Sequence, residues 1–190
     1  MLIVSTKCIF TVQDLAVLWS LPRGRNLFES IKYYVRSGKL IPLRRGLYAL
    51  PNDVRQHSQL ELAQKIVPLS YISLSTALTQ QGLVFQFQQS IQSVAMTSIN
   101  ITVLGQKFEY HKIKEDIFFN ATGLVKQDRW TLAGPERAIC DTLYFFPKAT
   151  FDNLLALNLN ALRDVAKIYN NQSLENRIQQ LIKKQETLHA

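Results

Sequence analysis

Residues 11–50 read TVQDLAVLWSLPRGRNLFESIKYYVRSGKLIPLRRGLYAL. Apolar side chains recur at helical spacing in two short segments, residues 12–20 and 26–37, and Leu21-Pro22-Arg23-Gly24 lies between them. Proline cannot continue the hydrogen-bond ladder of a helix and glycine tolerates unusual backbone angles, so this tetrapeptide predicts a turn. Two short apolar runs then flank Arg44-Arg45-Gly46, which predicts a hairpin. A helix, a turn, a second helix and a basic hairpin form the pattern of a winged helix-turn-helix.

The ends of both helices carry signals of their own. Thr11 precedes Asp14 by three residues, as in a capping box, with aspartate in the role usually taken by glutamate or glutamine. Gly38 follows the second helix and predicts its C-terminal stop. The first helix has one apolar stripe, formed by Val12, Leu15, Leu18 and Trp19.

The second helix is amphipathic, with a basic outer face. Its apolar stripe is Leu27, Phe28, Ile31, Tyr34 and Val35, and its opposite face carries Arg25, Glu29, Lys32, Tyr33 and Arg36. Arginine suits guanine edges and asparagine suits adenine edges in the major groove. Arg23, Arg25 and Asn26 stand at the start of this helix, where recognition helices contact bases. We therefore expect this face to read DNA; an ordinary solvated helix face is the alternative.

The predicted hairpin has strands at residues 40–43 and 47–50. Gly46 supplies the positive φ that a tight hairpin needs, and Pro42 restricts its strand to the edge of a sheet. Arg44 and Arg45 at the tip are well placed for phosphate or minor-groove contact. Replacing Arg44 by alanine is expected to weaken binding uniformly across sequences and to lower the salt slope by about one.

Charge and composition agree with a polyanion-binding module. The 190 residues carry a net charge of +8, of which +6 arises up to Arg55, from nine bases against three acids. Apolar residues make up 47% of a chain that shows no membrane-spanning run and no signal peptide, so a soluble globular protein is expected. The two unclustered cysteines, Cys8 and Cys140, indicate reduced thiols and a cytoplasmic location.

These residues also resemble a known family. The run FTVQDLA…LFESIKYYVRSGKLIPLRRGLYALP is similar to the winged helix-turn-helix of AbiEi-type antitoxins of type IV toxin–antitoxin and abortive-infection systems. Residues 67–78 (VPLSYISLSTAL) and 134–141 (GPERAICD) are similar to segments of that family's C-terminal domain. Family members usually carry a further helix before the one that begins near Thr11. Here ten residues precede it, so either they form a strand that pairs with the wing, or that helix is missing or supplied from elsewhere.

The resemblance implies a DNA-binding transcriptional autorepressor and antitoxin that binds inverted repeats in double-stranded operator DNA upstream of its own operon. It further implies a nucleotidyltransferase-like toxin encoded in the same operon, neutralised with a contribution from the C-terminal domain and without the need for a stable complex. The expected domains are a winged helix-turn-helix at residues 1–55 and an α+β antitoxin domain at residues 58–190.

The second domain is expected to mix helices with a small sheet, hence an α+β fold. Helices are predicted near residues 60–67, 73–81 and 135–146, and again from residue 151 onward. Residues 86–92 (QFQQSIQ) are interpreted as a polar connector. The runs SVAMTS and INITVLGQKFEYHKI alternate as strands do, with Gly105 near a turn.

No catalytic, cofactor or metal site is predicted in this domain. His57, His111 and His189 lack metal-ligand spacing, and no phosphate-binding glycine motif occurs. The polar residues of the 134–141 segment (Glu136, Arg137, Asp141) are interpreted as structural. Two alternatives stay open: a regulator whose C-terminal domain senses a ligand or binds a protein, and a nuclease that uses Glu136 or Asp141. The missing acidic constellation disfavours the enzyme.

Overall fold

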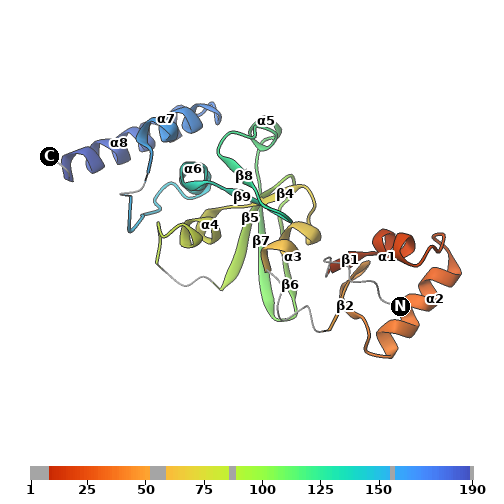
Figure 1. Cartoon of the computed structure of the whole chain (residues 1–190). Coiled ribbons are helices and arrows are strands. Elements are labelled where there is room, and N and C mark those ends of the chain that lie inside the picture. The colour runs from red at the N-terminus through yellow and green to blue at the C-terminus, as the bar shows by residue number, and fades with distance from the viewer. Residues whose placement is uncertain (1–8, 52–58, 86–88, 155–156, 189–190) are drawn as a thin grey trace. The chain divides into compact units, whose positions relative to one another are not determined.

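The computed structural model describes residues 9–51, 59–85, 89–154 and 157–188. The chain has the expected α+β fold and forms two compact units, Met1–Ile66 and Val67–Ala190 (Figure 1). The first unit thus includes the helix α3 (Gln59–Ile66). The division into domains at residues 1–55 and 58–190 stays a prediction.

The first unit is a winged helix-turn-helix. Its helices are α1 (Val12–Leu18) and α2 (Arg25–Arg36), and its strands are β1 (Ile9–Thr11), β2 (Ile41–Arg44) and β3 (Leu47–Ala49). The antiparallel sheet has the order β1-β3-β2, so Pro42 lies on an edge strand as expected. The residues just before α1 pair with the wing, which confirms one of the two alternatives for the N-terminus; residues 1–8 lie outside the described part of the chain.

Short-range chemistry accounts for the helix ends. The Thr11 hydroxyl accepts from the Asp14 N–H at 3.2 Å, and the Asp14 carboxylate accepts from the Thr11 N–H at 2.8 Å, so the capping box is confirmed. The helix α1 stops two residues earlier than expected, and Ser20 has a φ of 53° outside it. Gly38 has a φ of 70°, as a C-terminal stop requires.

The core of this unit joins the two helices to the sheet. Phe10, Leu15 and Leu27 are buried together, with Ala16, Ile31 and Leu40 completing the cluster. The rings of Trp19 and Tyr34 stack at 5.0 Å between centroids and seal its edge. This packing fixes α2 against α1 and leaves the opposite side of α2 to solvent.

The second unit is built on one mixed sheet of six strands, more extensive than the small sheet expected. The strands are β4 (Ser70–Ile72), β5 (Ser90–Ala95), β6 (Ile99–Val103), β7 (Gln106–Lys112), β8 (Leu124–Lys126) and β9 (Thr131–Ala133). The strand order is β6-β7-β5-β4-β9-β8; β5 is parallel to β7, β4 is parallel to β9, and the other neighbours are antiparallel. Part of the expected polar connector, Ser90–Gln92, is therefore strand.

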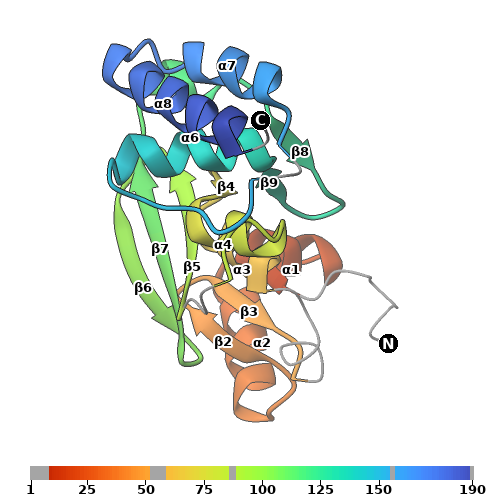
Figure 2. The ribbon, with the colours of Figure 1, turned by 90° about the vertical axis from the view of Figure 1, so that its left-hand side faces the viewer.

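Helices stack in layers on one face of this sheet (Figures 1 and 2). The helices of this unit are α4 (Leu74–Gln80), α5 (Glu115–Phe118), α6 (Pro135–Phe145), α7 (Leu159–Lys167) and α8 (Gln172–Leu188). Packed on α6 are α4 on one side and the hairpin of α7 and α8 on the other. The expectation of helix directly from residue 151 was wrong, because the chain there is tied to the loop after α4: the Leu83 carbonyl accepts from the Asp152 N–H at 2.9 Å.

Candidate nucleic-acid interface

The outer face of α2 presents its polar side chains to solvent. Arg25, Glu29, Lys32, Tyr33 and Arg36 are all exposed, and Tyr33 is 62% exposed. Leu27 and Ile31 on the opposite side are buried. Arg23 and Asn26 at the start of the helix are exposed as well. The placement of the helical face is thus as the spacing predicted.

Phe28 departs from the expected apolar stripe. Its side chain is 40% exposed and is not part of the core cluster formed by α1, α2 and the sheet. It lies one residue after buried Leu27, so it turns about 100° away from the core. Phe28 follows Arg25 by three residues and precedes Lys32 by four, and residues at these spacings lie on one side of a helix. This spacing was the sequence signal that Phe28 borders the polar face. An aromatic ring there can pack on a thymine methyl group.

Two side chains of this face are already paired with each other. The Lys32 ammonium donates to the Glu29 carboxylate at 2.8 Å, and both side chains stay more than half exposed. The hydrogen bond and the charge of Lys32 lower the pKa of Glu29, with a smaller contribution from Arg36. Glu29 is therefore ionised near neutral pH and compensates the charge of Lys32.

The start of α2 offers open backbone donors. Gly24 caps the helix with an extended backbone and has no side chain to accept from the first N–H groups. These groups carry the positive end of the helix dipole, which favours anions. The neighbouring Arg23 and Arg25 are exposed and reinforce the same sign of charge.

The wing is a short hairpin whose tip lies at the start of α1. Gly46 has a φ of 79°, as expected for this turn, and its carbonyl accepts from the Val12 N–H at 3.2 Å. Arg45 is exposed at the turn. Arg44 is also exposed, yet one of its guanidinium N–H groups donates to the Ile66 carbonyl at 2.6 Å. The sequence did not predict this contact. Because the carbonyl is neutral, the contact does not compensate the charge of Arg44, but it restricts the direction of the Arg44 side chain.

Comparison with protein families assigns this region. Residues 1–51 match the family described as transcriptional regulator, AbiEi antitoxin. Over these residues the chain is similar to AbiEi-type regulators. The match spans β1 to β3, including both helices and the whole wing. No curated protein is significantly similar to the chain.

The description of the matched family names transcriptional regulators and antitoxins. The resemblance of residues 67–78 and 134–141 to that family lies beyond the matched segment and stays a prediction. In the part of the chain that the structure describes, no helix is both long and apolar enough to cross a bilayer.

Beyond the matched segment, the most conspicuous polar group is buried. Arg137 and Asp141 on α6 are both 0% exposed, with 3.6 Å between Nε and Oδ1. The Asp141 carboxylate accepts from the hydroxyls of Ser73 and Tyr169, each at 2.6 Å, and of Tyr71 at 3.2 Å. Tyr71 lies in β4, Ser73 is the N-cap residue of α4 and Tyr169 follows α7, so the cluster ties these three segments to α6.

Arg137 also holds the chain before β8. It donates to the carbonyls of Ile117, Asn120 and Thr122 at 2.8–3.2 Å. Burial opposes its charge, but Tyr169, Asp141 and Tyr71 outweigh burial and raise its pKa. Enclosure of both charged groups supports the structural interpretation of this segment, because a catalytic pair must reach its substrate.

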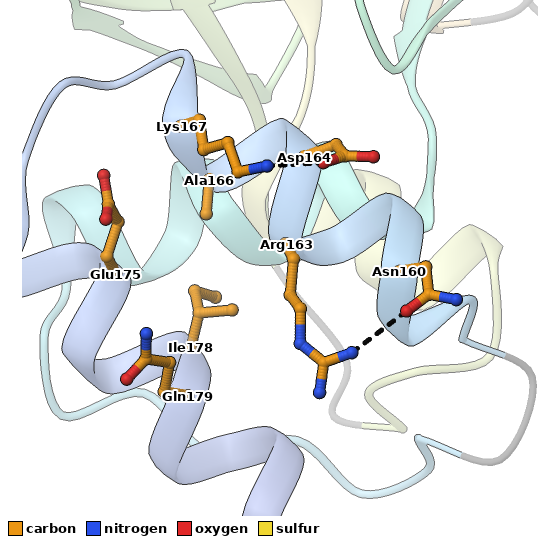
Figure 3. Close-up of a pocket in the computed structure, with 8 residues that line it drawn as sticks. All are labelled: Asn160, Arg163, Asp164, Ala166, Lys167, Glu175, Ile178 and Gln179. Carbon is orange, nitrogen blue, oxygen red and sulfur yellow. Dashed lines mark hydrogen bonds and ion pairs between the residues drawn. The ribbon is translucent and has the colours of Figure 1, made fainter.

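Other candidate sites in the second unit are weak. Burial raises the pKa of the Cys140 thiol, which fits a core residue. Among the described residues, no group of three His, Cys, Asp or Glu side chains could hold a metal; His57 and His189 lie outside them. A groove of about 340 Å³ runs between α7 and α8. Figure 3 shows that Lys167 donates to the Asp164 carboxylate and Arg163 to the Asn160 side chain. Arg163 also pairs with the Glu186 carboxylate at 3.4 Å, so both cations of the groove already have ionic partners.

Proposed function

We propose that this chain is a transcriptional autorepressor that binds inverted repeats in the operator DNA of its own operon. In this proposal α2 enters the major groove, with Arg25, Asn26, Lys32 and Tyr33 towards base edges. The remaining cations, at the helix flanks and the wing, hold phosphates: Arg23, Arg36, Arg44 and Arg45. Gly46 lets the wing turn tightly at its tip.

The observation that carries this proposal is the exposed basic face of α2 opposite a packed core. The positions 25, 29, 32, 33 and 36 repeat at helical intervals, so they form one continuous stripe. A helix fits the major groove, where each base pair shows a distinct pattern of donors and acceptors. The AbiEi assignment of the same residues gives independent support.

Fluorescence anisotropy tests the proposal directly. The full chain is titrated into a labelled duplex from the region upstream of its operon and into a shuffled duplex of equal length, at one salt concentration. Specific recognition predicts binding at least about 10³-fold tighter to the upstream duplex. Equal affinity for the two duplexes would refute operator recognition.

We further propose that the chain is the antitoxin partner of a nucleotidyltransferase-like toxin encoded beside it. Support comes from the AbiEi assignment alone, so the test must separate antitoxin action from repression. The toxin is expressed from an unrelated promoter together with the full chain or its Arg25→Ala/Arg36→Ala variant. Growth rescue by both proteins is expected, because the DNA face is not needed for neutralisation. Growth arrest in the presence of the wild-type chain would refute the antitoxin role.

A ligand-sensing regulator is the second candidate, favoured by a hollow of about 310 Å³ beside α4 and α6. Both apolar and polar side chains line it, among them Leu78, Phe146, Gln92 and Lys148. Leu74 in its wall has a φ of 55°, and such backbone strain concentrates at functional sites. A metabolite panel should then raise the melting temperature of the wild type and not of Ala149→Trp, whose indole would fill the hollow. No shift with any member would remove this candidate.

A further inference from the structure

One acid interrupts the basic face of the recognition helix. Glu29 is the only acidic residue of α2, and on the exposed face it lies between Arg25 on one side and Lys32, Tyr33 and Arg36 on the other. Its carboxylate is 58% exposed, ionised, and bonded to the Lys32 ammonium at 2.8 Å. A carboxylate at the centre of a basic DNA-binding face repels phosphates and lowers the affinity for every duplex. A contact between this carboxylate and a base would offset the lost affinity.

Major-groove chemistry limits what a carboxylate can meet there. An ionised carboxylate only accepts hydrogen bonds, and phosphates repel it. The donors on the floor of the major groove are the amino groups of cytosine N4 and adenine N6. Residues on the side of a helix that points into the groove meet these base edges, whereas residues on its flanks meet phosphates. Glu29 is therefore placed for a base and not for the backbone.

The Lys32–Glu29 pair narrows the choice of base pair. It presents a donor and an acceptor 2.8 Å apart. At a C·G pair, the Glu29 carboxylate can accept from the cytosine amino group while the Lys32 ammonium donates to guanine O6 and N7 beside it. At a T·A pair, the carboxylate would accept from the adenine amino group and the ammonium would donate to thymine O4. This arrangement is less favourable, because adenine N7, an acceptor, then lies beside the carboxylate and the thymine methyl lies beside O4.

Resting on the proposed DNA-binding function of α2, we propose that Glu29 and Lys32 together select one C·G base pair in each operator half-site. Glu29 accepts from the cytosine amino group, and Lys32 donates to O6 and N7 of the paired guanine. The acid thus reduces binding to random duplex and adds discrimination at one position.

Selection from a library of randomised duplexes tests this, with the full-length wild type and Glu29→Gln compared. The wild type should enrich C·G at one position per half-site, and replacing that pair should weaken binding by about tenfold. Glu29→Gln should lose this preference or move it towards A·T, because glutamine pairs with adenine N6 and N7. It should also bind random duplex more tightly. Glu115→Gln, at an exposed acid of α5, removes the same charge and should leave the preference unchanged.

Two outcomes overturn the proposal while leaving DNA binding by α2 intact. One is a uniform gain of affinity in Glu29→Gln with the wild-type base preference retained. The other is enrichment of T·A, and not of C·G, by the wild type. Failure of the proposed function itself looks different, because Arg36→Ala would then change neither the affinity nor its salt dependence.

Discussion

Replacing Arg45 by alanine measures whether the wing tip holds a phosphate. Four cations of the proposed interface hold phosphates: Arg23, Arg36, Arg44 and Arg45. Each phosphate contact contributes about 0.9 to the magnitude of the slope of log K against log salt, so the wild type should show a slope of about −3.6 per bound chain. The variant, with one contact fewer, should show a slope of about −2.7.

These slopes give measurable losses of affinity. Between about 50 and 200 mM KCl the affinity of the wild type should fall roughly 150-fold and that of Arg45→Ala roughly 40-fold, as measured by anisotropy on one operator duplex. Because a phosphate contact carries no sequence information, the variant should lose the same factor on a shuffled duplex. Arg163→Ala, an exposed arginine on α7, is the matched control and should keep the wild-type slope. A slope for Arg45→Ala equal to that of the wild type would refute the role of the wing tip.

Three further predictions concern the folded chain, each measured as its free energy of unfolding in urea. Tyr169→Phe removes a 2.6 Å donor from the buried Asp141 carboxylate and should cost about 1.5–3 kcal/mol; a cost below about 0.5 kcal/mol would contradict the structural role of the cluster. Thr11→Ala removes the cap of α1 and should cost about 0.5–2 kcal/mol, whereas Thr11→Ser should retain most of the stability; equal losses would argue against capping. Burial lowers the pKa of His111 below its usual 6.5, although Glu109 opposes this, so the unfolded chain takes up a proton that the folded chain does not. Stability should accordingly fall as pH falls below about 6.5, and His111→Phe should flatten that dependence.

The first unit could be predicted from sequence because its determinants are local. Pro22 and Gly24 break the helices, Thr11 caps one of them, and Gly46 turns the hairpin, each within a few residues of its effect. Helical spacing then separated the buried side from the exposed side of α2. The exception was Phe28, which stands at the border between the two sides, where a residue's burial depends on what packs against it.

The second unit could be predicted only in part because its determinants are distant in sequence. The i, i+4 spacing of Arg137 and Asp141 is typical of an ion pair on one helix, here α6. The sequence did not predict that Tyr71, Ser73 and Tyr169 donate to the same carboxylate, because 28 to 70 residues separate them from Asp141. The short strands β8 and β9 and the parallel pairing of β4 with β9 were missed for the same reason.

The Glu29–Lys32 pair shows why net charge alone does not define a repressor. A face with only positive charge binds any duplex. Because a genome offers about 10⁶–10⁹ competing sites, a protein with equal affinity for all of them is bound mostly at sites other than its operator. An acid on that face weakens binding to every site without a suitable amino group and keeps binding where one is present. Selectivity then rises even though total affinity falls. On this reasoning the single acid of α2 contributes as much to operator choice as the arginines that surround it.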